Sequence, residues 1–126
     1  MTPALIFEPS PPPLSALTDD HEAALIAEVV ALATGVPAAD IRSSARRGRA
    51  AVKARQAAMY LAYVIFQWPL DRVGAAFGRD RTTAGHACRQ IEDRRDDPDF
   101  DAGLEVLEAC LRVAPGAPGV ATVSLL

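Results

Sequence analysis

Apolar residues recur three and four positions apart in several parts of this sequence. The clearest case is residues 80–95, where Ala84, Ala87, Cys88 and Ile91 keep the spacing i, i+3, i+4, i+7. This spacing places them on one face of an α-helix, whereas a half-buried β-strand would alternate with a period of two. Aromatic residues make up only 6% of the sequence and alanine is abundant, which also favours close-packed helices. We therefore expect an all-α fold of five to six helices.

Capping and stop residues divide the chain into segments that we expect to be helical. Thr18 is placed to cap the first helix and Gly35 to end it. Asp80 is placed to cap a later helix by accepting hydrogen bonds from the N–H groups of Thr82 and Thr83. The expected helices are residues 19–34, 38–43, 50–67, 70–77 and 80–95, with a last one after the Asp97–Pro98 pair.

Three of these helices have apolar faces that we expect to be buried. The faces are Leu25, Val29, Leu32 and Ala33 in the first helix, Ala54, Ala58, Leu61 and Ile65 in the long one, and Phe100, Leu104, Leu107 and Leu111 in the last. Cys88 and Cys110 lie in similar patterns, so we expect both to be small buried side chains and not a disulfide. They lack the spacing of metal ligands, and no metal site is expected.

The two ends of the chain differ from its middle, which we expect to form one domain over residues 18–113. Residues 1–17 contain five prolines, which disfavour a regular helix, so we expect a flexible arm. Residues 114–126 are apolar and interrupted by proline and glycine; disorder, a short strand and a partner-binding tail all remain open. The first residues lack the basic and long apolar regions of a signal peptide, so we expect none. There is no run of about 18 apolar residues, so we expect a cytoplasmic protein without a membrane span.

Charge is distributed unevenly along the chain. The whole sequence has a net charge of −3, but residues 42–95 hold twelve Lys/Arg against four Asp/Glu, a net charge of +8. A basic middle with acidic ends is typical of a protein that binds a polyanion; a merely solvated charged surface is the alternative. No nucleophile–base pair or metal cluster stands out, so we do not expect an enzyme.

A short helix, a glycine turn and a longer helix occupy residues 70–95 in that order. This is the pattern of a helix-turn-helix, which places its second helix in the major groove of DNA. If the apolar residues of the second helix face inward, its outward positions are Arg81, Thr82, Gly85, His86 and Arg89. Such side chains contact base edges and phosphates, and the helix N-terminus attracts phosphate. A solvated helix face without a ligand is the alternative.

Two stretches of the sequence closely resemble the C-terminal DNA-binding domain of the bacterial replication initiator DnaA. They are RSSARRGRAAVKARQAAMYLAY and LDRVGAAFGRDRTTAGHACRQIEDRR, and the similarity covers about residues 25–112. The resemblance implies a stand-alone domain that binds double-stranded DNA and no nucleotide or other cofactor, since the sequence has no Walker A loop. The implied function is regulation of replication initiation or of transcription at sites like the initiator's binding box, in association with the nucleoid.

The resemblance also assigns roles to individual residues. Arg55 matches the arginine that the family inserts into the minor groove, and the basic loop with Arg46, Arg47 and Arg49 lies along phosphates. The residues that match the signature reading the major groove are Asp80, Thr82, Thr83 and His86. With the neighbouring cations, the expected DNA-binding set is Arg46, Arg47, Arg49, Lys53, Arg55, Arg79, Asp80, Arg81, Thr82, Thr83, His86 and Arg89.

Four departures from the family's pattern fall in the helix-turn-helix. Arg81 replaces a histidine, Asp71 replaces a proline, Gly85 replaces an aliphatic residue, and one of two glycines before Arg79 is missing. We therefore expect DNA binding to be retained but the preference for the box to be altered. The competing hypothesis is a protein-interaction module that binds the replication initiator, or its complexes, with little DNA binding of its own.

Overall fold

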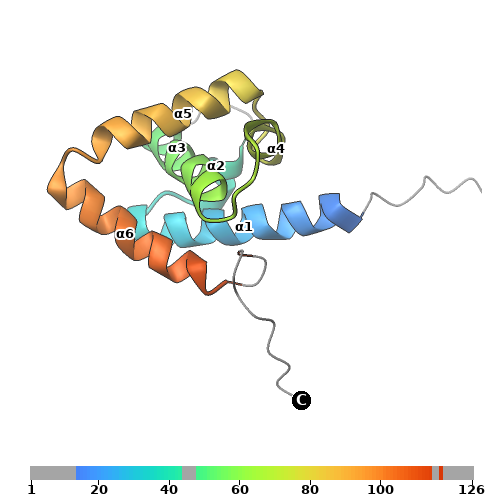
Figure 1. The fold of residues 1–126 in the computed structure, drawn as a ribbon, viewed down its shortest axis with the longest axis horizontal. Coiled ribbons are helices and arrows are strands. Elements are labelled where there is room, and N and C mark those ends of the chain that lie inside the picture. The colour runs from blue at the N-terminus through green and yellow to red at the C-terminus, as the bar shows by residue number, and fades with distance from the viewer. Residues whose placement is uncertain (1–13, 44–47, 115–116, 118–126) are drawn as a thin grey trace, which may run out of the picture.

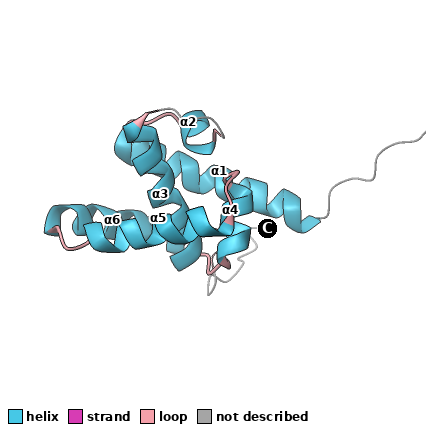
Figure 2. Ribbon diagram, turned by 90° about the horizontal axis from the view of Figure 1, so that it is seen from above, coloured by secondary structure: helices cyan, strands magenta, loops and turns pink. Residues whose placement is uncertain are grey.

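The computed structural model describes residues 14–43, 48–114 and 117, and these residues form six α-helices and no strand (Figures 1 and 2). The helices are α1 (Leu14–Thr34), α2 (Ala38–Arg42), α3 (Arg49–Val64), α4 (Leu70–Ala76), α5 (Arg81–Arg94) and α6 (Pro98–Arg112). The all-α expectation is confirmed. None of the helices in these ranges is long and apolar enough to cross a bilayer.

Helix α3 lies at the centre and packs against α1, α2, α4 and α5. Its alanine-rich sequence lets the neighbouring helices approach closely, and the expected face of Ala54, Ala58, Leu61 and Ile65 is buried throughout. In Figure 1, α5 runs along one side of α3, and α1 crosses the other side. After the turn at the end of α5, α6 diverges from α5 and packs on α1.

Helix α1 starts earlier than expected and buries a different face. It begins at Leu14, because the last proline of the arm directly precedes it and a proline is tolerated at the start of a helix. The expected arm is therefore wrong for residues 14–17, and Thr18 lies inside the helix; residues 1–13 are outside the described part. The buried apolar residues are Ala23, Ile26, Ala27 and Val30. Of the expected face, Leu25 and Val29 are partly buried, whereas Ala33 is exposed and Leu32 is 87% exposed.

Helix α6 buries most of the residues that the sequence indicated. Leu104 and Leu111 are fully buried, and Phe100 and Leu107 are partly buried. The expectation for Cys110 is wrong, because it lies on the opposite face of the helix and is exposed. Of the expected tail, Ala114 and Ala117 are described, and both are buried against the core.

A partly buried polar network joins α6 to α3 and α5. Arg95, the residue that ends α5, donates through Nη1 to the hydroxyl of Tyr60 (3.0 Å) and to Oε2 of Glu108 (2.9 Å), and through Nε to Asp101. The Tyr60 hydroxyl donates to Oε1 of Glu92 (2.6 Å). Burial is the main cause that raises the pKa of Tyr60 to about 12, so Tyr60 stays a neutral donor at physiological pH.

We expect Glu108→Ala to lower the free energy of unfolding by about 2 kcal/mol, because the guanidinium of Arg95 loses its more buried carboxylate. Only 6% of the Glu108 side chain is exposed. Urea denaturation measures the change. The control is Glu28→Ala, which removes an exposed carboxylate of α1 and should stay within about 0.5 kcal/mol of the parent. Equal effects of the two substitutions would mean that the network does not hold α6.

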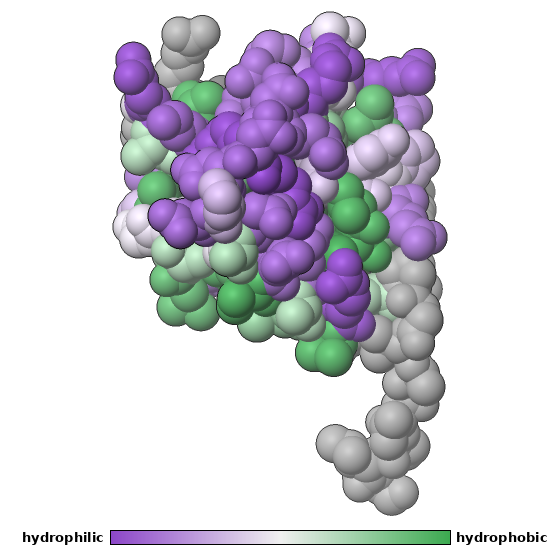
Figure 3. All heavy atoms as spheres, turned by 60° about the vertical axis from the view of Figure 1, so that its left-hand side comes forward, coloured by the Kyte–Doolittle hydropathy of each residue, from purple (hydrophilic) through white to green (hydrophobic). Residues whose placement is uncertain are grey.

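Figure 3 shows the end of the molecule at which α5 turns into α6. Hydrophilic side chains gather over the upper and central part of this face, and hydrophobic ones lie along its lower edge. Asp93 in the last turn of α5 and Asp96 and Asp97 after it are exposed. The C-terminal end of α5 is therefore acidic, in contrast to its N-terminal half.

Candidate nucleic-acid interface

The turn between α4 and α5 depends on two glycines. Gly78 adopts a positive φ of 67°, which a glycine reaches without strain. Gly74 lies against the start of α5: a Cβ atom there would be 2.6 Å from the carbonyl oxygen of Arg79 and 2.8 Å from that of Asp80. The N–H group of Arg79 also donates to the carbonyl oxygen of Gly74 (2.7 Å). This approach of two backbones sets how α4 and α5 cross.

Asp80 caps the N-terminus of α5, as expected. Its side chain accepts a hydrogen bond from the backbone N–H group of Thr83 (2.8 Å), and this bond is the main cause that holds the pKa of Asp80 below its usual range. The carboxylate is therefore ionised at neutral pH. It fixes the first turn of α5, where the remaining N–H groups and the helix dipole attract an anion.

The two faces of α5 are close to what the sequence predicts. The inner residues Ala84, Ala87, Cys88 and Ile91 are buried, and Arg81, Thr82, His86 and Arg89 are exposed. Gly85 does not face outward as expected: it is buried, because Leu70 of α4 and the Arg89 side chain cover it.

Burial raises the pKa of the Cys88 thiol to about 11. Cys88 therefore stays a protonated thiol at neutral pH and serves as a small core residue.

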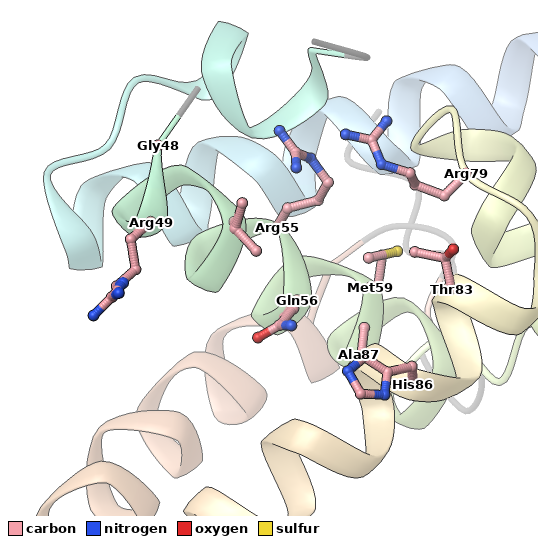
Figure 4. Close-up of a pocket in the computed structure, with 10 residues that line it drawn as sticks. Gly48, Arg49, Arg55, Gln56, Met59, Arg79, Thr83, His86 and Ala87 are labelled. Atoms are coloured by element: carbon pink, nitrogen blue, oxygen red, sulfur yellow. The ribbon is translucent and has the colours of Figure 1, made fainter. Parts of the chain in front are cut away.

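A groove of about 560 Å³ lies between the N-terminal half of α3 and the N-terminal half of α5 (Figure 4). Arg49, Val52 and Gln56 line it from α3, and Thr83 and His86 line it from α5. The groove brings together residues that are far apart in the sequence. Its two walls carry cations, an amide, a hydroxyl and an imidazole, which are the donors and acceptors that contact phosphates and base edges.

Arg55 lies at one end of this groove but is not on the surface. Its side chain is buried (4% exposed), its Nε donates to the carbonyl oxygen of Ile41 (2.9 Å), and its Nη2 donates to that of Asp40 (3.0 Å). Burial is the main cause that lowers its pKa. The resemblance implies that Arg55 enters the minor groove, whereas here its guanidinium holds the C-terminal end of α2 against α3. To reach DNA it would have to leave both carbonyl oxygens.

We expect Arg55→Ala to lower the free energy of unfolding by about 2 kcal/mol, because two carbonyl oxygens lose a buried donor. Duplex affinity, measured where both proteins are fully folded, should change little. The matched control is Lys53→Ala, an exposed position two residues earlier, which should weaken duplex binding and leave stability unchanged. A loss of affinity for Arg55→Ala as large as that for Lys53→Ala would instead support a direct contact with DNA.

Arg79 connects the helix-turn-helix to the segment that precedes the basic loop. Its guanidinium donates to the carbonyl oxygens of Gly78 (3.0 Å) and Ser43 (3.3 Å). Gly48, on the other side of the loop, lines the groove. Arg46 and Arg47 lie outside the described residues; before their segment, Ser43 is hydrogen-bonded to Arg79, and after it, Gly48 lines the groove.

Not every positive charge counted in residues 42–95 is available to a ligand. Arg42 pairs with Asp20 (2.7 Å), and Arg72 pairs with Asp19 (2.6 Å) and stacks on the ring of Trp68. Arg94 stacks on Phe100, and Arg95 belongs to the network with Glu108. Among the described residues of the segment 42–95, the exposed cations that form no ion pair are Arg49, Lys53, Arg81 and Arg89. All four lie in α3 or α5.

Residues 23–91, more than half of the chain, match the family described as bacterial dnaA protein helix-turn-helix. The chain belongs to this family. The match confirms the resemblance, and a DnaA-type helix-turn-helix is a DNA-binding domain and not a catalytic one.

Curated relatives of this DnaA-type domain are whole initiator proteins. The chain is 43% identical over 67 residues to the chromosomal replication initiator protein DnaA of Psychromonas ingrahamii, and 46% identical over 71 residues to that of Caulobacter sp. strain K31. These matches cover 52% and 55% of this chain and 15% of each relative. The chain therefore corresponds to a small part of the length of the relatives that it matches.

Solved structures of DnaA-related proteins share the fold. A crystal structure of a DNA replication initiation factor superposes with a TM-score of 0.68 at 29% identity, over 78% of this chain and 30% of that one. Replication initiator DnaA bound to AMPPCP and single-stranded DNA gives a TM-score of 0.68 at 28% identity, with the same coverage.

Proposed function

We propose that this domain binds double-stranded DNA, with the N-terminal half of α5 in the major groove and the start of α3 with the basic loop against the phosphates. The observation that carries the proposal is the position of the exposed cations that form no ion pair in the described part of the basic segment 42–95. Arg49 and Lys53 lie in the first turns of α3, and Arg81 and Arg89 lie on the outer face of α5. In helix-turn-helix proteins, a helix with such an exposed face, packed against a second helix, is the element that contacts the bases.

The residues of α3 and α5 would have different roles in DNA recognition. Arg49 and Lys53 contact phosphates, which supplies affinity without reading sequence. Thr82 and His86 are exposed in the first turns of α5 and reach base edges, which supplies preference. The proposed sites resemble the initiator's box, and by occupying them the protein regulates replication initiation or transcription.

A titration of a labelled duplex that carries the initiator box, against a scrambled duplex, tests the proposal. We expect the box duplex to bind more tightly, and log K to fall with log salt by about 0.9 for each phosphate contact. The four exposed cations of α3 and α5 that form no ion pair therefore predict a slope of at least about three. No binding to either duplex at low salt would overturn the proposal and would favour the alternative, a module that binds the initiator protein.

Arg81 is expected to set the preference of the recognition helix. It is exposed at the first position of α5, and a guanidinium reaches further than an imidazole and favours O6 and N7 of guanine. Arg81→His should shift preference toward the initiator box by about 1–3 kcal/mol, measured as the ratio of affinities for box and variant duplexes. Equal weakening of all duplexes would place Arg81 on a phosphate. If neither Arg81→His nor Arg81→Ala changes binding, Arg81 lies outside the interface.

A further inference from the structure

Helix α6 is apolar on two opposite faces. Its inner face, which includes Leu104 and Leu111, packs against the core. The second set consists of small or apolar residues, all exposed, that recur three and four positions apart. They are Ala102, Gly103, Val106, Ala109, Cys110 and Val113. This spacing confines them to one side of the helix, opposite the inner face. We call this set the outer stripe of α6.

Within the residues that the structure describes, nothing covers the outer stripe. Val106 is 62% exposed and Val113 is 75% exposed, whereas the outer face of a surface helix is ordinarily polar. A Cβ atom at Gly103 would have no atom of the described residues within 4 Å, so the glycine makes room for nothing in the described part of the chain. A glycine inside a helix costs about 1 kcal/mol relative to alanine. Both observations indicate that another helix packs on the stripe.

The charges beside the stripe indicate which helix that is. Glu105 and Arg112 are exposed and stand seven positions apart, so they lie on the same edge of the stripe. If two copies of α6 packed antiparallel about a two-fold axis, Glu105 of each copy would lie beside Arg112 of the other. Val106 of each copy would then lie opposite Cys110 of the other. A parallel arrangement would instead place Glu105 and Arg112 of the two copies on opposite edges of the contact, so these pairs would not form.

We propose that the outer stripe of α6 is a self-association surface, through which two copies of the chain pack their α6 helices antiparallel. The contact is isologous, since the same residues serve both copies. A helix of 15 residues is about 22 Å long, and a standard interface takes about 20–30 residues from each side. The dimer is therefore weak. No residue of the stripe lines the groove between α3 and α5, so DNA binding leaves the stripe open.

Sedimentation velocity of the full chain without DNA, over a wide range of concentrations, tests the proposal. We expect a reversible equilibrium between monomer and dimer, which Val106→Asp weakens at least about tenfold. The control is Ala39→Asp, which adds the same charge at an exposed position of α2 and should leave the equilibrium unchanged. Circular dichroism checks that both variants are folded. A parent that is monomeric at all concentrations, or a dimer that Val106→Asp does not weaken, overturns the proposal.

Charge reversal tests the antiparallel arrangement. Glu105→Arg and Arg112→Glu each convert two pairs of opposite charges into like charges, so each variant alone should dimerise about tenfold more weakly than the parent. An equimolar mixture of the two variants should dimerise again, because every contact between unlike copies then joins opposite charges. Variants that dimerise alone as well as the parent would overturn the antiparallel arrangement, since parallel packing predicts no loss.

Discussion

Replacing Arg46, Arg47 and Arg49 together by alanine is expected to weaken duplex binding about a hundredfold near physiological salt and to lower the salt slope by about three. The physical reason is the release of counterions: each cation that neutralises a phosphate contributes about 0.9 to the slope. The loss should be similar for box and scrambled duplexes, because phosphate contacts carry no sequence information. Fluorescence anisotropy at several salt concentrations measures both quantities.

Arg72→Ala is the control for this prediction. Arg72 belongs to the same basic segment, but its guanidinium pairs with Asp19 and stacks on Trp68. Removing the Arg72 side chain should change duplex affinity by no more than about twofold. It lowers the net charge of the protein by one, as each of the three substitutions in the triple variant does. If the triple variant binds as tightly as the parent, the phosphate contacts lie elsewhere. If Arg72→Ala weakens binding as much as the replacement of one loop arginine does, the overall charge of the protein determines affinity, and the positions of the cations do not.

The sequence predicted α5 well because its signals agree. The apolar residues Ala84, Ala87 and Ile91 have unbroken helical spacing, and Asp80 stands where a cap is needed. In α1 the apolar residues occur on nearly every side of the helix, so spacing alone could not select the buried face. Packing against α3 selected it, and this exposes Leu32.

The charged residues could be counted from the sequence, but their ion-pair partners could not be predicted from it. The Arg72–Asp19 pair joins residues 53 positions apart, so no pattern of neighbouring residues predicts it. A resemblance to a family also does not predict the partners of a charged residue. The motif identified Arg55, but only the structure shows that its guanidinium donates to the carbonyl oxygens of Asp40 and Ile41. The polar network around Arg95 and Glu108 was missed for the same reason.

The surroundings of two glycines could not be predicted from the sequence either. Gly85 was expected on the outer face because a helical wheel places it there, but the short helix α4 lies over that position. Gly74 was not singled out at all. Its one signal is a helix-disfavouring residue inside a segment of seven helical residues, which is a cue for a close backbone approach.

Gly74→Ala is expected to lower the free energy of unfolding by about 3 kcal/mol or to prevent folding. The added Cβ would lie 2.6 Å from one backbone carbonyl oxygen and 2.8 Å from the next, and backbone atoms cannot rotate away as a side chain can. Any relief of this clash must move α5 relative to α4, so the variant should also lose its preference between box and scrambled duplexes.

The matched control is Gly85→Ala. Its Cβ would meet Cδ1 of Leu70 at 3.5 Å, an ordinary contact with a flexible side chain, and alanine raises helix propensity by up to about 1 kcal/mol. We therefore expect Gly85→Ala to be neutral or stabilising in urea denaturation and to keep its duplex binding. If Gly74→Ala instead unfolds within about 0.5 kcal/mol of the parent, the crossing of α4 and α5 does not depend on that glycine. Opposite outcomes of one substitution at two glycines would show that the backbone approach at Gly74, and not helix propensity, holds the recognition helix in place.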